Sequence, residues 1–261
     1  MSVFEKARRI VIKVGSSSLT YDTGMVNIRQ IEKLCKILSD IKNSGRQVIL
    51  VTSGAIPVGA SKLGLAAKPT TMPEKQAAAA AGQCELMYIY DKHFLEYHHK
   101  VAQILLTRDI IEKDELRTHA VNTFETLLKL GAIPIVNEND TIAVDEIRFG
   151  DNDTLSAIVA SLTKADGLIL LSDIDGLFEE NPKDNPDAKI IPLVTEIDDH
   201  IRSIAGGAGS NRGTGGMATK IAAAEICFSC GCSMAIINSS RFETLYDILE
   251  GKQVGTLFER R

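Results

Sequence analysis

The sequence lacks any apolar run long enough to cross a bilayer, and its first residues hold only the short run Ile10–Ile12. A transmembrane helix needs about 20 consecutive apolar residues. A secretory signal peptide also needs a longer apolar region than this one. We therefore expect no membrane segment, interpret Arg9–Val14 as the first strand of the mature chain, and expect a cytoplasmic protein.

The sequence has no excess of positive charge. Its 29 lysines and arginines stand against 34 aspartates and glutamates, which gives a formal net charge of −5. A nucleic-acid-binding surface normally appears as a basic stripe, and none is visible. With 261 residues, 44% of them hydrophobic, the chain can bury a large core. These features exclude nucleic acid as the main partner and favour a small-molecule substrate.

Cysteine is scarce and odd in number. Five cysteines argue against a disulfide framework. Cys227, Cys230 and Cys232 lie close together, but no second Cys/His pair follows to complete a metal site. We expect buried free thiols here and no metal bound by the protein.

The common nucleotide-binding motifs are missing too. The sequence has no G-x-x-x-x-G-K-[ST] loop, no G-x-G-x-x-G after the first strand, and no H-R-D or D-F-G set. All five histidines fall in predicted helices or connections, and we expect them at the surface. They are His93, His98, His99, His119 and His200. If the chain uses a nucleotide, it does so with another architecture.

What the sequence does contain is an alternation of apolar strand-like runs with helical periodicity. Strands are predicted at Arg9–Val14, Val48–Val51, Val101–Leu106, Ala132–Val136, Gly167–Leu171 and Met234–Ile237. Helices are predicted from Ile28 to Ile41, from Pro73 towards Tyr97, from Arg117 to Leu130, over Thr154–Thr163 and from Met217 to Cys230. A hairpin is predicted at Thr141–Phe149 and a solvated loop at Asn181–Lys189. Strands separated by helices need crossover connections. The fold class is therefore α/β, with a mostly parallel open sheet covered on both faces.

Polar and glycine-rich clusters follow the predicted strands, where ligands bind in such sheets. The clusters are Lys13 with Gly15–Ser18, Thr52–Ala55, Asn137–Asp140, Gly150–Asp153, Ser172–Asp173 and Gly213–Lys220. The last is the most specific, because a glycine-rich loop that opens a helix is an anion site. Taken singly, the first two also fit an ordinary turn or a helix N-cap.

Lys13, Lys220 and Asp153 together suit phosphoryl transfer, which needs positioning and charge neutralisation more than covalent chemistry from the protein. A carboxylate acceptor has a reference pKa of about 4.3, so it is already a nucleophile and needs no general base. Asp140 can accept from an ammonium group, and Ser53 can donate to a carboxylate. The pattern favours an amino acid as acceptor.

Five segments occur in an order and at distances that resemble the amino acid kinase family, in its branch that phosphorylates glutamate. They are Ile12–Gly15, Thr52–Ile56, Val136–Asp140, Gly150–Asp153 and Gly213–Lys220, and the resemblance runs from Arg9 to about Phe258. It implies a three-layer αβα sandwich and the transfer of phosphate from MgATP to L-glutamate. The products would be L-glutamyl 5-phosphate and ADP, in the first step of proline biosynthesis.

The resemblance also implies roles for individual residues. Lys13 and Lys220 would stabilise the transferring phosphoryl group, with Asp153 holding both lysines. The residues that would bind glutamate are Ser53, Gly54, Asp140 and Asn152, and those that would bind ATP are Lys13, Ser172, Asp173, Thr214, Gly215, Gly216, Met217, Ala218, Thr219 and Lys220. Many relatives carry threonine in place of Ser172 and serine in place of Ala218, so Ala218 is expected to contribute its backbone only.

By the same resemblance, residues 1–261 are expected to form a single kinase domain without the PUA domain that follows it in many relatives. Its acceptor-binding half would cover about 1–165 and its ATP-binding half about 166–261. A homo-oligomer (a dimer or a tetramer) and feedback inhibition by L-proline, sensed near Thr141–Phe149, are also expected.

Two alternatives stay open. The acceptor could be that of another family member, such as acetylglutamate, aspartate, carbamate or a nucleoside monophosphate. A nonenzymatic sensor of amino acids or nucleotides could use the same fold, but its mark would be the loss of Lys13, Asp153 or Lys220, and all three are present.

Overall fold

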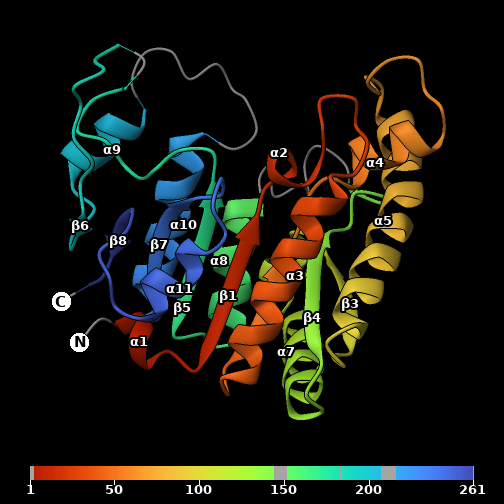
Figure 1. Cartoon of the computed structure of the whole chain (residues 1–261), viewed down its shortest axis with the longest axis horizontal. Helices are drawn as coiled ribbons and strands as arrows, with labels where there is room; N and C mark the ends of the chain where they lie inside the picture. The colour runs from red at the N-terminus through yellow and green to blue at the C-terminus, as the bar shows by residue number, and fades with distance from the viewer. Residues whose placement is uncertain (1–2, 144–151, 183, 207–215, 261) are drawn as a thin grey trace. The chain divides into compact units, whose positions relative to one another are not determined.

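The computed structural model describes residues 3–143, 152–182, 184–206 and 216–260 (Figure 1). The chain forms two compact units. Unit 1 consists of Met1–Lys13 and Gly150–Arg261, and unit 2 of Val14–Phe149. We describe each unit by itself.

The sheet of unit 1 begins with β1 (Arg9–Val14), of which all but the last residue belong to this unit. It continues through β5 (Gly167–Ser172), β7 (Ser233–Asn238), β8 (Thr256–Phe258) and β6 (Leu193–Val194), in that spatial order. β5 and β7 are parallel, with Ser172 opposite Asn238, whereas β8 is antiparallel to β7. β5 is buried along its whole length, as expected for a strand with helices over both faces.

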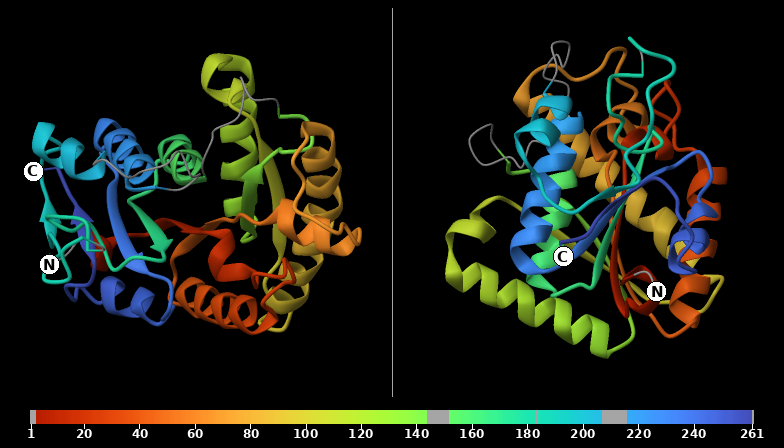
Figure 2. Two further views of the ribbon diagram at one scale, coloured as in Figure 1. Left: turned by 90° about the horizontal axis from the view of Figure 1, so that it is seen from above. Right: turned by 90° about the vertical axis from the view of Figure 1, so that its left-hand side faces the viewer.

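Helices cover both faces of these strands (Figure 2). One face carries α8 (Asn152–Leu162), α9 (Asp199–Ala205) and α10 (Met217–Cys230), and α10 packs against both α8 and α9. The other carries α11 (Thr244–Leu249), which packs against α1 (Val3–Lys6). The layering confirms the predicted α/β fold class for this unit.

Unit 2 has three parallel strands in the order β3 (Val101–Leu106), β4 (Ile133–Glu138) and β2 (Gln47–Val51). Its helices are α2 (Ser16–Leu19), α3 (Ile28–Asn43), α4 (Ala55–Lys62), α5 (Met72–Leu95), α6 (Asp109–Glu112) and α7 (Asp114–Lys129). α3 and α5 lie over one face of the strands and α7 over the other (Figure 2). The mostly parallel sheet with helices on both faces is again as predicted.

α4 and α5 approach each other backbone to backbone, because glycine replaces a side chain on each. A Cβ atom at Gly59 would lie 1.7 Å from the carbonyl oxygen of Ala78, and one at Gly82 would lie 1.8 Å from that of Ala55. α5 is started by a capping box of Thr71 and Glu74. The alanine run of α5 therefore forms a tightly packed helix, and this packing fixes where α4 begins.

Most predicted elements are present, with shifted ends. β4 runs on to Glu138, because its parallel pairing with β3 continues through Leu106 and Glu138. Asn137 and Glu138 are thus strand residues, and their placement after the strand was wrong. The helix predicted from Arg117 begins at Asp114. The short elements β6, α2 and α9 carried too little periodicity to be predicted.

Two predictions about single residues were also wrong. His93 is only 7% exposed, since it lies on a face of α5 that also holds Phe94 and Tyr90. Cys227 and Cys232 are buried free thiols, but Cys230 is exposed at the last residue of α10. Within the described ranges, no helix combines the length and apolarity needed to cross a bilayer.

Some predictions cannot be compared with the structure. Most of the predicted hairpin, from 144 to 149, and the start of the glycine-rich loop, residues 213–215, lie outside the described residues.

We predict that Gly59→Ala destabilises the protein strongly. The new Cβ would meet the backbone of α5, which cannot move without separating the two helices, so the free energy of unfolding should fall by at least about 3 kcal/mol. Urea denaturation followed by circular dichroism measures this. The matched control is Gly206→Ala, whose Cβ would have its nearest neighbour, the Arg202 carbonyl oxygen, at 3.5 Å. Equal stabilities for the two variants would contradict the packing argument.

Candidate active site

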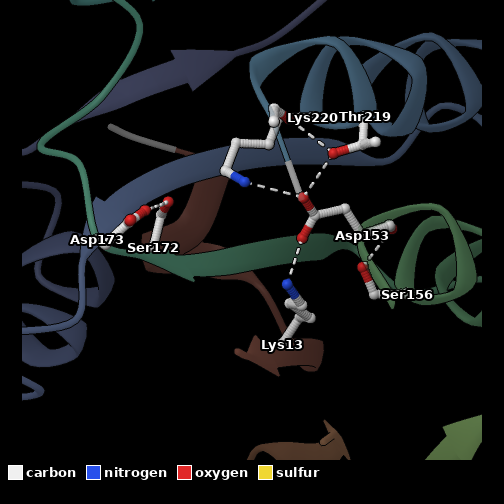
Figure 3. A network of polar contacts seen from close by, with 8 residues as sticks. Lys13, Asp153, Ser156, Ser172, Asp173, Thr219 and Lys220 are labelled. Carbon is white, nitrogen blue, oxygen red and sulfur yellow. Dashed lines mark hydrogen bonds and ion pairs between the residues drawn. The ribbon is translucent and has the colours of Figure 1, made fainter. Parts of the chain in front are cut away.

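A carboxylate in unit 1 joins two lysines that lie far from it in the sequence (Figure 3). Asp153 lies in the first turn of α8 and is fully buried. Lys13 Nζ is 2.6 Å from Asp153 Oδ1, and Lys220 Nζ is 2.9 Å from Asp153 Oδ2. The three residues that the sequence analysis placed at the centre of the chemistry therefore meet within one unit.

The fold of unit 1 explains this meeting. Lys13 is the fifth residue of β1, close to the carboxyl end of that strand, and it is 7% exposed. α8 and α10 pack against each other, and both helices carry buried alanines such as Ala157 and Ala224. Asp153 and Lys220 each lie in the first turn of their helix, so the packing of the two helices brings both to the same end.

Hydroxyl groups complete the surroundings of the carboxylate. Thr219 Oγ1 is 3.1 Å from Asp153 Oδ2 and 2.7 Å from the carbonyl oxygen of Gly216. A hydroxyl carries one proton, so the two bonds are alternatives. Ser156 Oγ donates to the main-chain oxygen of Asp153 at 2.6 Å. Of these contacts, the one between Thr219 and Asp153 joins the first turn of α10 to the first turn of α8.

The electrostatics keep the carboxyl group ionised. Burial by itself raises the pKa of Asp153, but the ammonium groups of Lys13 and Lys220 outweigh it and hold the pKa below its usual value. With two ammonium groups and one carboxylate, the three side chains carry a net charge of +1. A buried charge excess is costly unless an anion offsets it. The cluster is suited to bind an anionic group.

Other predicted nucleotide-binding residues also lie in unit 1. Gly216 is the N-cap of α10, and Met217 and Ala218 follow it in the first turn, where backbone N–H groups have no partner within the helix. Ser172, buried, ends β5, and its hydroxyl donates to the exposed Asp173 carboxylate at 3.2 Å (Figure 3). Thr214 and Gly215 lie outside the described residues.

The predicted acceptor residues divide between the units. Asn152, buried beside Asp153, is in unit 1. Ser53, Gly54 and Asp140 are in unit 2. There, Thr52 N–H donates to the Val136 carbonyl oxygen at 2.8 Å, so the ends of β2 and β4 are held together.

Gly54 itself needs to be glycine. It is the N-cap of α4 and has φ +98°, a left-handed conformation that L side chains rarely adopt. The left-handed turn ends β2 and starts α4 at once. Ser53 is thereby set at the helix N-terminus, and the half-buried Asp140 follows the adjacent strand. The structure thus brings these three residues to one edge of unit 2.

The sequence analysis missed a layer of buried polar side chains that α5 places beneath this edge. Gln83 accepts from Asn137 Nδ2 at 2.9 Å, and the Tyr90 hydroxyl is 2.7 Å from Thr52 Oγ1. Gln83 and Tyr90 are seven residues apart, on the same buried face as Leu86. A glutamine on an apolar helical stripe was the signal that could have revealed the layer.

We predict that Asp153→Asn destabilises the protein. The change leaves two buried ammonium groups without their carboxylate, so the free energy of unfolding should fall by about 3 kcal/mol or more. Urea denaturation at pH 7 measures this. Asp187→Asn, in an exposed loop, is the control and should have no measurable effect.

We also predict how this difference depends on pH. The pKa of Asp153 is lowered in the folded state, so its contribution is complete above the unfolded pKa of about 3.9 and is lost as pH falls through the folded pKa. The stability difference between wild type and Asp153→Asn should therefore be constant from pH 7 to pH 5 and shrink below about pH 4. A difference that grows on acidification would contradict the ion-pair assignment.

Comparison with known proteins gives relatives over nearly the whole chain. The sequence is 56% identical to "Glutamate 5-kinase" of Clostridium perfringens over 256 residues, which covers 97% of this chain and 95% of that relative. It is 51% identical to "Glutamate 5-kinase" of Enterococcus faecalis over 258 residues, again covering 97% and 95%.

Solved structures with low sequence identity share the fold. Carbamate kinase from Giardia lamblia bound to AMP-PNP has a TM-score of 0.69 at 17% identity, with 98% of this chain and 100% of that chain covered. UMP kinase from Bacillus anthracis has a TM-score of 0.65 at 18% identity, with 97% and 96% covered. Residues 8–238 match the sequence profile of the amino acid kinase family. Its sequence and its fold together place the chain in the amino acid kinase family.

Proposed function

We propose that the chain transfers the γ-phosphate of ATP to the side-chain carboxylate of L-glutamate, giving L-glutamyl 5-phosphate and ADP. This is the first step of proline biosynthesis. The observation that carries the proposal is the buried Lys13–Asp153–Lys220 cluster, in a chain that is 56% identical to a glutamate 5-kinase over nearly its full length.

Membership of a kinase family implies ATP as phosphoryl donor. The first turn of α10, with Gly216, Met217 and Ala218, offers backbone N–H groups to its phosphates. Ser172 and Asp173, at the end of β5, would bind the rest of the nucleotide. Thr214, Gly215 and Thr219 complete the set that the family resemblance assigns to ATP.

The chemical step needs little from the protein beyond charge and position. An oxygen of the glutamate side-chain carboxylate attacks the γ-phosphorus, and the bond between that phosphorus and the β–γ bridging oxygen breaks. ADP leaves with the electron pair, and no proton has to move. Lys13 and Lys220 would offset the charge on the γ-phosphoryl oxygens, and Asp153 would hold both ammonium groups in place.

Mg²⁺ enters this scheme as part of the substrate MgATP. Among the residues that the structure describes, no group of three or more histidine, cysteine, aspartate or glutamate side chains could hold a metal ion. Both carboxylate oxygens of Asp153 contact lysines. Mg²⁺ commonly keeps several waters and binds through substrate phosphates, which suits such a site.

The acceptor would be held by Ser53, Gly54, Asp140 and Asn152. The Ser53 hydroxyl and the backbone N–H groups at the start of α4 would donate to a carboxylate. Asp140 would accept from the substrate ammonium group. A neutral or cationic acceptor would make poor use of these groups.

Three further expectations remain predictions. One is the division of labour, with an acceptor-binding half of about residues 1–165 and an ATP-binding half of about 166–261. Another is a homo-oligomer, a dimer or a tetramer. The last is inhibition by L-proline, sensed near Thr141–Phe149, most of which lies outside the described residues.

A panel of acceptors tests the substrate. With MgATP and glutamate, the purified protein should form an acyl phosphate that hydroxylamine traps as the hydroxamate. Aspartate, acetylglutamate, carbamate and UMP should be turned over more slowly. Equal or faster turnover of any of these would overturn the glutamate assignment, and no turnover of any would favour the sensor alternative.

The change Lys220→Met tests the proposed role of the cluster. It removes the ammonium group but keeps most of the side-chain volume, so kcat should fall by about 100-fold or more, while the dissociation constant for glutamate should change little. The control is Lys252→Met, which removes an exposed lysine paired with Asp247 and Glu250. An unchanged kcat in Lys220→Met would remove Lys220 from the mechanism.

A further inference from the structure

Gln83 has a buried hydrogen-bond donor that the fold leaves unused. Its side chain is on α5 and is 7% exposed, and its amide nitrogen, Nε2, has no hydrogen-bond partner among the described residues. An unsatisfied buried donor costs about 1–3 kcal/mol. Tyr90, on the same face of α5, has its hydroxyl paired with Thr52. Another buried polar group on this face is thus satisfied within the protein, whereas the amide nitrogen of Gln83 is not.

The orientation of the Gln83 amide is fixed by its neighbours. The backbone N–H of Glu138 donates to Asn137 Oδ1 at 2.9 Å, so Asn137 must present its Nδ2 to Gln83. The acceptor on Gln83 must be its side-chain oxygen, because two NH₂ groups cannot form a hydrogen bond with each other. A flipped amide would break this arrangement. The donor side of Gln83 is consequently the side without a partner.

Gln83 lies between the two segments of unit 2 that carry proposed acceptor residues. Asn137, its partner, is in β4, three residues before Asp140. Gly82, which precedes Gln83 in the sequence, lies against the carbonyl oxygen of Ala55. Ala55 is the first residue of α4 and directly follows Ser53 and Gly54. The unused donor is thus beneath the edge where a carboxylate-bearing ligand is proposed to bind.

We propose that Gln83 is a specificity-determining residue of the acceptor site, and that its amide NH₂ donates to a carboxylate oxygen of the bound amino acid. This rests on the proposed function, which supplies the carboxylate-bearing ligand. Because Gln83 would contact the bound acceptor and not the transferring phosphoryl group, the bond should be the same before and during phosphoryl transfer. It contributes uniform binding, which sets the affinity for glutamate more than kcat.

The variant Gln83→Glu distinguishes the role of the accepting oxygen from that of the donating NH₂ group. The variant keeps an oxygen to accept from Asn137 and replaces the NH₂ group with a second oxygen. If Gln83 only supports Asn137, glutamate binding should survive. If Gln83 donates to the ligand, then at pH 8 the dissociation constant and KM for glutamate should rise about 10- to 100-fold, with KM for ATP within about twofold of wild type.

The pH dependence of the same variant gives a second readout. A buried carboxyl group has a raised pKa, and its protonated form can donate one hydrogen bond. Glutamate affinity of Gln83→Glu should therefore recover partly between pH 8 and pH 6, relative to wild type. A structural defect would not recover on acidification.

Calorimetric titration with glutamate alone, followed by steady-state assays, completes the test. Gln83→Met removes both sides of the amide, so it should weaken glutamate binding and also lower the melting temperature. Ser39→Ala is the matched control, since Ser39 on α3 has a buried hydroxyl without a hydrogen-bond partner among the described residues. It should leave glutamate affinity unchanged.

The outcomes distinguish this inference from the proposed function. Unchanged glutamate binding in Gln83→Glu at pH 8 would overturn the inference and leave the function intact. It would mean that an ordered water satisfies the donor. Binding of glutamate by wild type without phosphoryl transfer would overturn the function, while the titrations still decide the role of Gln83. Absence of glutamate binding by wild type contradicts both.

Discussion

The contact of one buried carboxylate with two lysines is the constraint on which unit 1 depends. Asp153 holds Lys13 from a strand and Lys220 from a helix, and none of the three would be stable in the core without the others. The charged groups whose burial costs most are therefore paired with one another. The three side chains together carry a net charge of +1, which suits the cluster to bind an anion.

Unit 2 is organised differently, around backbone contact instead of charge. Gly59 and Gly82 let α4 and α5 touch, and this contact fixes the start of α4 immediately after Gly54. Beneath the same edge, α5 presents Gln83 and Tyr90 to the ends of two strands. The precise placement of the acceptor residues follows from the close packing of these helices and from the polar contacts under them.

The two arrangements fit one kind of chemistry. A reaction between two anions, a carboxylate and a polyphosphate, needs positive charge where the phosphoryl group moves and neutral donors where the acceptor is held. In our proposal, unit 1 supplies the first in Lys13 and Lys220. Unit 2 would supply the second in Ser53, in backbone N–H groups and, by our inference, in Gln83. No histidine is required, because a carboxylate acceptor is already ionised at neutral pH.

The sequence by itself determined the fold class, most of the longer elements and the cluster at the centre of the site. Apolar periodicity is a local property, so it can be read from the sequence alone. The segments around Lys13, Asp153 and Lys220 follow strands or begin helices, and their order along the chain is typical of the family.

Tertiary structure alone decided the rest. Whether β4 ends at Val136 or at Glu138 depends on its pairing with β3, and the burial of His93 depends on which face of α5 meets the core. The pairing of Gln83 with Asn137 joins residues 54 positions apart in the sequence, so no local pattern could reveal it. Such contacts form between elements, and their partners are known only when the elements have packed.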